Sequence, residues 1–551
     1  MERVEKYGRW HYEFERSGGV ERVAFAAPDG KTSERPVFVH LPTAFTYDEH
    51  GYEAVKETGR ATLAVRFTPT VAGTWTYRAM RGGDVVEEGA IECVESGNPG
   101  YVEISARDPR YFAFTDGSPY CAIGLDLCWP VRYRLSKGRE FERSARTGTL
   151  GMGDYRRWFG KMRAHGANFA RIWLSNPYFA VWDEDPDELD LGAFARSDAL
   201  VELAREHGVR LKLCIDNFRS FDADVAQHTA LRDKEGESPA DMEDFYTNPR
   251  WQEAWWRKVE AYVARYGDDP AVMAFELWNE INACRVDFAV ARDWTQRTLA
   301  RLKPMVPRQL VTNSLGSFDV EDKQRLQDEF KMDELDFQQV HRYLDQGARI
   351  AMVREDPVAF SVDAIRRSRR PDRPVLLAET GAVNDTHTGP FRYYRHDDDG
   401  IIFADTTFPA FFAGAAGSGH IWHWDQYVDQ KDLWDGFAPL AQCVAGVKLD
   451  AEGFESVDLS TARAWALGLK GARHVLLWCR NKSDSWSPRL RDGASAAPVA
   501  DMRIDLAALG ATDSRVEYCK GWRETPGPAR IEGDQLVLPA FRRMVFLRLA
   551  R

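Results

Sequence analysis

The chain has 551 residues, and at this length we expect three or four domains, or one large barrel with smaller attachments. Hydrophobic residues make up 44% and charged residues 29% of the chain, which provides for a large core and excludes wholesale disorder. The 73 Lys and Arg against 85 Asp and Glu give a net charge of −12, so we expect neither nucleic acid nor a membrane as a partner.

The chain is rich in aromatic residues, with 18 Trp, 19 Tyr and 30 Phe. Flat rings over a groove suit sugars, whose C–H faces stack on them, and the alternative is that these rings fill cores and interfaces. The eight cysteines are scattered without CxxC pairs, which predicts reduced, mostly buried thiols. The sequence begins without the apolar stretch of a signal peptide, so we expect a cytoplasmic protein, or a secreted one if such a peptide was removed.

The first expected domain is an N-terminal β-sandwich, residues 1–100. Short alternating runs such as ATLAVRFTP and TWTYRAM are separated by Gly and Asp turn signals, a pattern typical of antiparallel strands. Phe67, Trp75 and Tyr77 share one parity, so we expect their rings on one buried face of a sheet.

Residues 101–450 are expected to form a (β/α)8 barrel, because short apolar runs alternate with helical stretches. The predicted strands are residues 121–126, 168–174, 210–216, 272–280, 309–314, 337–343, 374–380 and 419–425. Before the fourth strand, Asn248 can cap a helix, Pro249 lies in its first turn and Gly267 ends it. Long connections follow strands one, three, seven and eight. They either surround the face of the barrel where such enzymes have their active sites or are tolerated surface insertions.

A second β-sandwich, residues 451–551, is expected to close the chain, because alternation returns in runs such as HVLLWCRN and MVFLRLA. The predicted fold class is therefore α/β, a TIM barrel flanked by N-terminal and C-terminal β-sandwich domains.

Two predicted barrel strands end in a glutamate, Glu280 in VMAFELWNE and Glu379 in PVLLAET. A lone glutamate at a strand end is more often a salt-bridge partner, but two that face each other across a barrel mouth are a more specific signal. Hydrolysis of a glycosidic bond with retention needs two carboxylates about 5 to 5.5 Å apart, one ionised and one protonated.

With these residues the barrel, at about residues 111–446, resembles glycoside hydrolase clan A, the cellulase-like retaining enzymes, and DPAVMAFELWNEIN is its best motif. The resemblance implies that Glu280 is the general acid/base, that Glu379 is the nucleophile and that Asn279 binds the sugar 2-hydroxyl. The N-terminal segment also resembles a sandwich domain of undefined function that often precedes such barrels.

The same resemblance extends to further residues of the barrel. Arg171 resembles the family arginine that keeps the nucleophile ionised, and His341 with Tyr343 resembles a His-x-Tyr pair whose tyrosine bonds the nucleophile. Trp422 or Trp424 is expected to be the sugar platform, and the sequence leaves the choice between them open. No cofactor is implied.

Elementary electrostatics supports the same division of roles. Arg171 and the Tyr343 hydroxyl would stabilise the charged form of Glu379, while Trp278 and neighbouring rings would exclude water from Glu280 and favour its protonated form. We therefore expect a bell-shaped dependence of rate on pH that belongs to the coupled pair.

Other interpretations of the sequence carry less weight. A metal-dependent hydrolase is disfavoured because no H-x-H follows strand one and no HExxH is present, so we expect no metal. Asp126 either binds substrate hydroxyls or caps a loop.

The predicted function is a retaining hydrolase of β-linked glycosides in oligosaccharides, acting by double displacement. The alternative is a non-catalytic carbohydrate-binding barrel. Aromatic sandwich surfaces could support a homo-oligomer.

Overall fold

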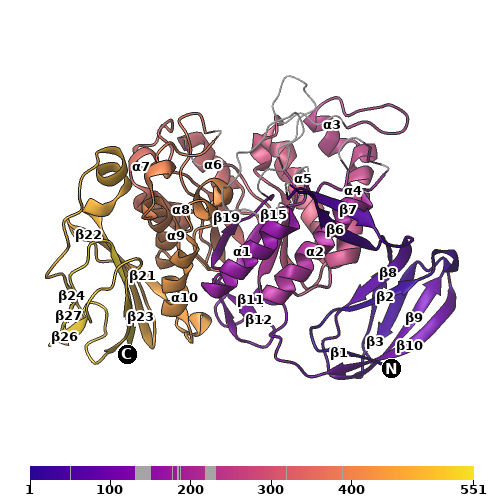
Figure 1. Ribbon diagram of the computed structural model, residues 1–551, viewed down its shortest axis with the longest axis horizontal. Coiled ribbons are helices and arrows are strands. Elements are labelled where there is room, and N and C mark those ends of the chain that lie inside the picture. The colour runs from indigo at the N-terminus through magenta and orange to yellow at the C-terminus, as the bar shows by residue number, and fades with distance from the viewer. Residues whose placement is uncertain are drawn as a thin grey trace.

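The structure, a computed structural model, describes residues 1–49, 51–130, 151–175, 178–182, 185–186, 188–217, 231–317, 319–387 and 389–551. N-terminal β-sheets, a central body of parallel strands surrounded by helices, and C-terminal β-sheets lie side by side in chain order (Figure 1). The α/β fold with additional sheets at both ends therefore agrees with the predicted class. Residues 131–150 and 218–230, which belong to the predicted long connections after strands one and three, lie outside the described residues.

The N-terminal region contains a five-stranded sheet of order β1-β10-β9-β3-β4 and a three-stranded sheet of order β2-β8-β5. The strands are β1 (Glu2–Glu5), β2 (Trp10–Phe14), β3 (Arg22–Ala26), β4 (Thr32–Pro36), β5 (Phe38–His40), β8 (Thr62–Phe67), β9 (Gly73–Arg81) and β10 (Asp84–Val94). Phe67, Trp75 and Tyr77 are buried in one core, as their shared parity predicts.

A hairpin of β6 (Thr43–Tyr47) and β7 (Glu53–Glu57), which the sequence analysis does not predict, leaves these sheets and lies beside the barrel helix α2 (Leu191–His207) (Figure 1). Glu53 makes the contact with the barrel. Its carboxylate accepts hydrogen bonds from the Tyr178 hydroxyl at 2.8 Å and from the Met152 N–H at 2.7 Å. The hairpin thus attaches the N-terminal region to segments that surround the barrel mouth.

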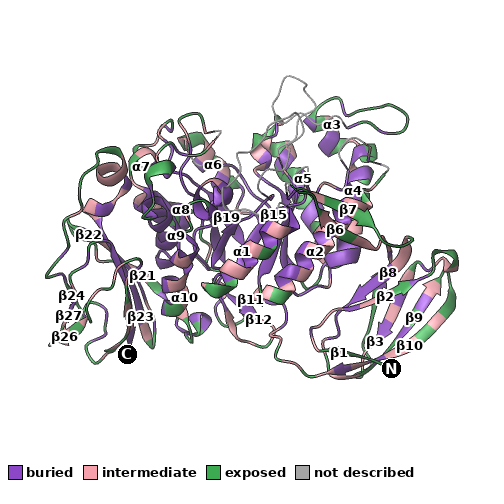
Figure 2. Cartoon of the chain, viewed as in Figure 1, coloured by how far each residue is buried: buried purple, intermediate pink, exposed green. Residues whose placement is uncertain are grey.

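The barrel strands are parallel, with β14 to β18 in one sheet in chain order and β19 paired with β20. The strands are β14 (Gly124–Asp126), β15 (Phe169–Trp173), β16 (Arg210–Asp216), β17 (Val272–Trp278), β18 (Leu310–Thr312), β19 (Gln338–His341) and β20 (Val375–Glu379). All their residues are buried, and Figure 2 shows this central buried layer beneath the helices. Burial on both faces explains why these strands read as continuous apolar runs.

Helices and a small sheet complete the barrel. The helices are α1 (Met152–Ala164), α2, α3 (Met242–Thr247), α4 (Pro249–Tyr266), α5 (Phe288–Leu302), α6 (Glu321–Glu329), α7 (Ala351–Glu355), α8 (Pro357–Ser368), α9 (Ile401–Phe412) and α10 (Ala438–Val444). The sheet joins β11 (Val102–Ile104), β12 (Phe112–Phe114) and β13 (Pro119–Tyr120). Helix α4 begins and ends as predicted: the Asn248 side chain accepts from the Arg250 N–H at 3.0 Å, and Gly267 is the C-cap.

The prediction of an eighth strand over residues 419–425 is wrong. The chain does pass through the eighth position, but it closes the barrel by single bridges, from Gly417 to the segment before β14 and from Ile421 to Thr380. A π-helical segment, Trp424–Asp429, starts directly afterwards. Since this turn takes the backbone out of the extended conformation, the apolar run cannot continue as a strand.

The C-terminal region has a five-stranded sheet, β21-β22-β23-β28-β25, and a three-stranded sheet, β24-β27-β26. The strands are β21 (Glu455–Asp458), β22 (Ala464–Lys470), β23 (His474–Asn481), β24 (Arg503–Asp505), β25 (Arg515–Lys520), β26 (Arg530–Glu532), β27 (Gln535–Val537) and β28 (Met544–Ala550). In β23, Trp478 packs near Phe408 of α9, while Val475 and Leu477 belong to the core between the two sheets. The larger sheet therefore buries both faces.

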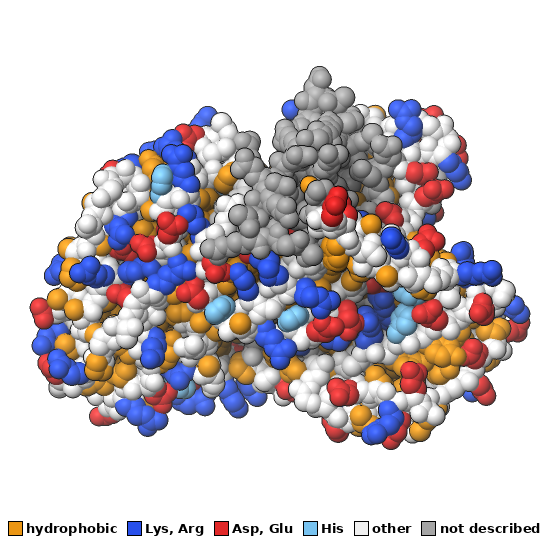
Figure 3. Space-filling view, in the orientation of Figure 1, with side chains coloured by type: hydrophobic (Ala, Val, Ile, Leu, Met, Phe, Trp, Pro, Cys, Tyr) orange, Lys and Arg blue, Asp and Glu red, His pale blue; other side chains and the backbone are white. Residues whose placement is uncertain are grey.

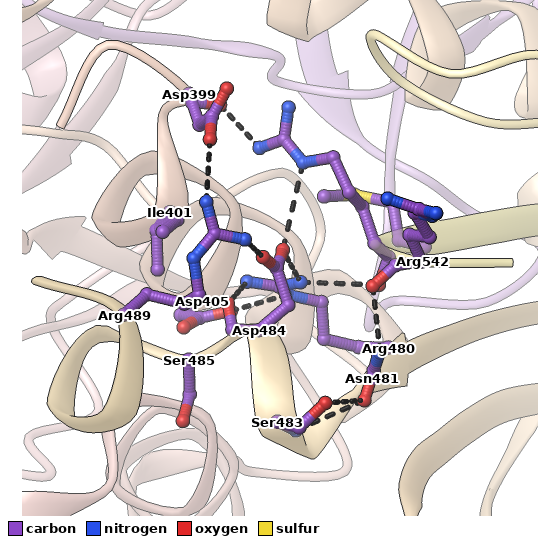
Figure 4. Close-up of polar contacts among 12 residues, drawn as sticks. Asp399, Ile401, Asp405, Arg480, Asn481, Ser483, Asp484, Ser485, Arg489 and Arg542 are labelled. Carbon is purple, nitrogen blue, oxygen red and sulfur yellow. Dashed lines mark hydrogen bonds and ion pairs between the residues drawn. The ribbon is translucent and has the colours of Figure 1, made fainter. Parts of the chain in front are cut away.

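A buried ionic network fastens this sheet to the barrel (Figure 4). Arg480 of β23 donates to Asp405 of α9 at 2.7 Å and to Asp484 at 2.6 Å, and all three side chains are fully buried. Arg489 bonds Asp484 at 2.5 Å and Asp399 at 3.0 Å. Removal of one partner would leave buried charges without a counter-charge, which is costly. The network therefore fixes the position of the C-terminal sheet on α9.

The surface and the cysteines complete the description. Basic and acidic side chains are interspersed on the face shown in Figure 3. No helix in the described part of the chain is long and apolar enough to span a membrane. Seven of the eight cysteines are buried, as their scattered spacing predicts.

Candidate active site

The carboxyl ends of the barrel strands bring Glu280 and Glu379 together. Glu280 directly follows Asn279 after β17, and Glu379 is the last residue of β20. One oxygen of each carboxyl group and one ring nitrogen of His341 lie within 4.8 Å of one another. Residues from three strands therefore converge on one point of the barrel mouth.

Glu379 is held by two hydrogen-bond donors. The Arg171 Nη1 group of β15 donates to its Oε1, and the Tyr343 hydroxyl donates to its Oε2 at 2.6 Å. The Arg171 side chain is fully buried, and only 4% of the Glu379 side chain is exposed. A carboxylate that accepts from a buried guanidinium and a phenol is fixed in orientation.

Arg171 is itself positioned by a second glutamate beneath the site. Its Nε and Nη2 groups each lie 2.8 Å from an oxygen of Glu276, and Lys212 lies 3.1 Å from the same carboxylate. Burial alone would raise the pKa of Glu276, but the charges of Arg171 and Lys212 outweigh burial and hold that pKa well below its usual value. Lys212 was not singled out by the sequence analysis, because a lysine in a predicted strand gives no sign that it points inward.

Glu280 has a different environment. Its backbone has φ of +50°, a left-handed conformation rare outside glycine, and its N–H donates to Ser314 Oγ at 2.9 Å. The side chain is 14% exposed. Burial raises the pKa of Glu280, against the opposing charges of His387 and Arg171, so its protonated form persists to higher pH than that of a free glutamate.

His341, from β19, lies between the two carboxyl groups. Its Nδ1 is 2.8 Å from Glu280 Oε1 and 3.4 Å from Glu379 Oε2. Burial lowers the pKa of His341 to about 4, although the charge of Glu379 opposes this. At neutral pH the ring is therefore uncharged, and it orients the carboxyl groups without adding a charge to the site.

Asn279 offers an unused donor. Its Oδ1 accepts from Arg171 at 2.6 Å, while its Nδ2 is buried and has no hydrogen-bond partner among the described residues. Since a buried amide without a partner is costly, this N–H group suits a substrate hydroxyl.

The two tryptophans of the eighth position differ in exposure. Trp424 is 1% exposed, whereas Trp422 is partly exposed and packs against the rings of Trp129 and Trp173 at 5.4 and 4.9 Å. The partly exposed ring is the one that a sugar can reach. The geometry thus favours Trp422 as the platform and makes Trp424 its support.

Two residues expected to bind substrate do not lie where the sequence placed them. Trp278 is fully buried and packs against Tyr246 and Trp294 in the layer between β17 and the helices, so it cannot stack on a sugar. Asp126 is also fully buried, 3.3 Å from Arg171, and burial raises its pKa well above the usual value. Both residues lie at strand ends, as the sequence predicts, but the neighbours of each side chain in the folded barrel decide what it contacts.

A histidine missed by the sequence analysis also lies at the mouth. His387 follows β20 in a loop, at φ of +58°, and its Nδ1 lies 2.9 Å from Asp345 while its Nε2 lies 3.1 Å from Ser317 Oγ. Its ring meets the Tyr343 ring edge-on at 5.5 Å. A single histidine in a long polar loop carries no periodicity, so only the tertiary structure reveals this position.

Three groups of side chains are close enough to hold a metal ion in the described part of the chain. One is the pair of glutamates with His341, and the other two are His11, Glu13 and His40, and Asp319, Asp345 and His387. In the last group, Lys323 already lies 2.7 Å from Asp319, so its ammonium occupies the place where a cation would be attracted. This arrangement is better suited to hydrogen bonding than to a metal.

Comparisons with known proteins agree with this geometry. A mannan endo-1,4-β-mannosidase A of Emericella nidulans is 28% identical over 204 residues, which cover 34% of this chain and 52% of the relative. A candidate mannan endo-1,4-β-mannosidase 4 of Arabidopsis thaliana is 25% identical over 289 residues, which cover 46% of this chain and 68% of the relative. The chain thus spans about half to two thirds of the length of these relatives. No protein-family model matches.

A solved structure from Bacteroides vulgatus, described as a candidate glycoside hydrolase, matches all of this chain and is itself fully covered, with a TM-score of 0.55 and 13% identity. This match concerns the fold alone. The mannosidase relatives confirm the expected resemblance to glycoside hydrolase clan A and the expected enzyme class, that of the glycosidases.

Proposed function

We propose that this relative of the clan A glycoside hydrolases cleaves β-linked glycosides with retention of configuration, with Glu379 as nucleophile and Glu280 as acid/base. The observation that carries the proposal is the approach of the two carboxyl groups, whose nearest oxygens lie within 4.8 Å of each other. Retaining enzymes hold such groups about 5 to 5.5 Å apart, whereas inverting enzymes leave room for a water at about 6.5 to 9.5 Å.

In the first step, the ionised Glu379 attacks the anomeric carbon and forms a carbon–oxygen bond. The bond from that carbon to the leaving oxygen breaks, its electron pair stays on the oxygen, and Glu280 supplies the proton. Arg171 and Tyr343 hold Glu379 in the attacking orientation. Burial raises the pKa of Glu280 and so favours the protonated form that acts as the acid.

In the second step, Glu280, now a carboxylate, takes a proton from a water molecule. The resulting hydroxide attacks the anomeric carbon, the bond to Glu379 breaks, and the sugar is released with its original configuration. The unused Asn279 Nδ2 donor is placed to bind a substrate hydroxyl during both steps. The partly exposed Trp422 provides the ring for stacking.

For the substrate we propose a β-mannoside in a mannan-type oligosaccharide, because the relatives carry the name mannan endo-1,4-β-mannosidase. The test is hydrolysis of manno-oligosaccharides beside a panel of nitrophenyl β-glycosides, with the configuration of the first product followed by NMR. Release of a β-configured mannose end supports the proposal. Hydrolysis with inversion, or binding of mannan oligosaccharides without any cleavage, would refute it, and the latter result would indicate a carbohydrate-binding barrel.

A further inference from the structure

Glu280 has two histidine neighbours of opposite character. His341 touches its carboxyl group directly but is fully buried and neutral. His387 is 34% exposed, and the hydrogen bond to Asp345 together with the charge of Glu280 raises its pKa despite partial burial. Of the two histidines, His387 is therefore the one whose charged form is favoured.

The position of His387 is built by three loops. Its ring is held between Asp345, after β19, and Ser317, after β18, while its own loop is closed by a bridge between Val383 and Pro390. Asp345 is in turn fixed by the Gly347 N–H at 2.8 Å. A non-glycine residue at φ of +58° is strained, and such strain persists only where the surroundings hold the residue in place.

The loop that holds His387 also holds Glu280. Ser314 accepts from the Glu280 N–H, Ser317 contacts His387, and a Cβ placed on Gly316 between them would lie 3.4 Å from Glu280 Cδ. The two side chains are therefore fixed against one short segment. This segment lies on the side of the mouth formed by β17, β18 and β19, across from the tryptophans packed around Trp422.

Both residues are surrounded by several other charged or titratable groups. Those around Glu280 are Arg171, Glu276, Lys323, His341, Tyr343, Glu379 and His387, and those around His387 are Glu280, Asp319, Tyr343, Asp345 and His423. Lys323 is paired with Asp319 at 2.7 Å, and Arg171 is bonded to Glu276 and Glu379. His387 is thus the imidazole near Glu280 whose raised pKa favours the charged form, whereas Arg171 and Lys323 are already paired with carboxylates.

We propose that His387 is a positioning residue for the acid/base: its imidazolium, held by Asp345 and Ser317, stabilises the carboxylate that Glu280 becomes once it has protonated the leaving oxygen. This inference rests on the proposed function. The charge favours proton release in the first step, and it holds the carboxylate ready to accept a proton from water in the second. The benefit is largest for a sugar leaving group, which departs only when protonated.

The test compares His387→Asn with wild type in the full chain. Asparagine tolerates the left-handed backbone and can still donate to Asp345, but it carries no charge. We expect the alkaline limb of kcat/KM to move up by about 0.5 to 1 pH unit, and kcat on a manno-oligosaccharide to fall about two- to fivefold. Rates on a dinitrophenyl glycoside, whose leaving group needs no proton, should change less than about twofold.

Two further variants separate charge from structure. His387→Lys keeps the charge and should return the limb toward the wild-type position, while His396→Asn removes an exposed histidine of the same long connection and should leave the profile unchanged. A limb that does not move in His387→Asn, in a variant with wild-type melting temperature, overturns the inference. A wild-type protein that cleaves no glycoside refutes the proposed function instead.

Discussion

Replacement of Arg171 by methionine tests the buried charges beneath the active site. The guanidinium contacts three carboxyl groups, those of Asp126, Glu276 and Glu379, and after its removal Lys212 would be the cation left beside Glu276 among the described residues. The cheapest relief is protonation of one carboxyl group. For a group of usual pKa 4.5 this costs about 3 kcal/mol at pH 7, so we expect a loss of about 3 to 5 kcal/mol in the free energy of unfolding.

The assay is scanning calorimetry, since several transitions are expected in a chain of this size. A loss of this magnitude should lower the melting temperature of the barrel by roughly 4 to 7 °C. The penalty belongs to a carboxyl group that must be protonated in the folded state, so it should shrink as the pH falls from 7 toward 5. The double variant Arg171→Met/Glu276→Gln removes one of the carboxylates that lost its cation. It should therefore regain about 1 to 3 kcal/mol in the free energy of unfolding.

The matched control is Arg297→Met, which removes an exposed arginine paired with Asp293 and should cost no more than about 0.5 kcal/mol. The reasoning would be refuted if Arg171→Met melted within 2 °C of the control, which is less than about 1.5 kcal/mol for a domain of this size. It would equally be refuted by a deficit of the same size at pH 5 and pH 7.

The remaining predictions concern catalysis. Glu379→Ala should lower kcat by more than about a thousandfold, and added azide should restore turnover and give a glycosyl azide of inverted configuration, detected by NMR. Because the pKa of Glu280 is raised and its protonated form is the acid, kcat/KM on oligosaccharides should fall as pH rises through that pKa. Glu280→Gln should lose this limb in a pH–rate profile measured on the same oligosaccharides, and it should lose far less activity on a dinitrophenyl glycoside. Trp422→Ala should raise KM for oligosaccharides by an amount equivalent to about 1 to 2 kcal/mol of binding free energy. Trp424→Ala should mainly lower the melting temperature.

Each of these has its own control or contrary result. If azide did not raise the turnover of Glu379→Ala, Glu379 would not be the nucleophile. A Glu280→Gln variant that keeps the wild-type alkaline limb would assign the limb to another group. If Trp424→Ala, and not Trp422→Ala, raised KM while the fold stayed intact, the assignment of the platform would be reversed.

The sequence alone determined the features that depend on local pattern. Alternation of apolar residues predicts the sheets at both ends, the repeated strand and helix pattern predicts the barrel, and Asn248, Pro249 and Gly267 set the bounds of α4. A glutamate at the end of each of two strands predicts the pair at the mouth, because the carboxyl ends of parallel strands meet on one face of a barrel.

Tertiary structure decided what depends on contacts between distant segments. The eighth strand is replaced by single bridges, since its closure depends on neighbours far away in sequence and on the π-helical segment after it. The direction of Trp278 follows from the helix rings that surround it. His387 comes near Glu280 because loops after three strands meet, and a periodic sequence pattern does not predict which loops meet. Local periodicity fixes the type of element, whereas the packing of distant elements fixes which side chains share a site.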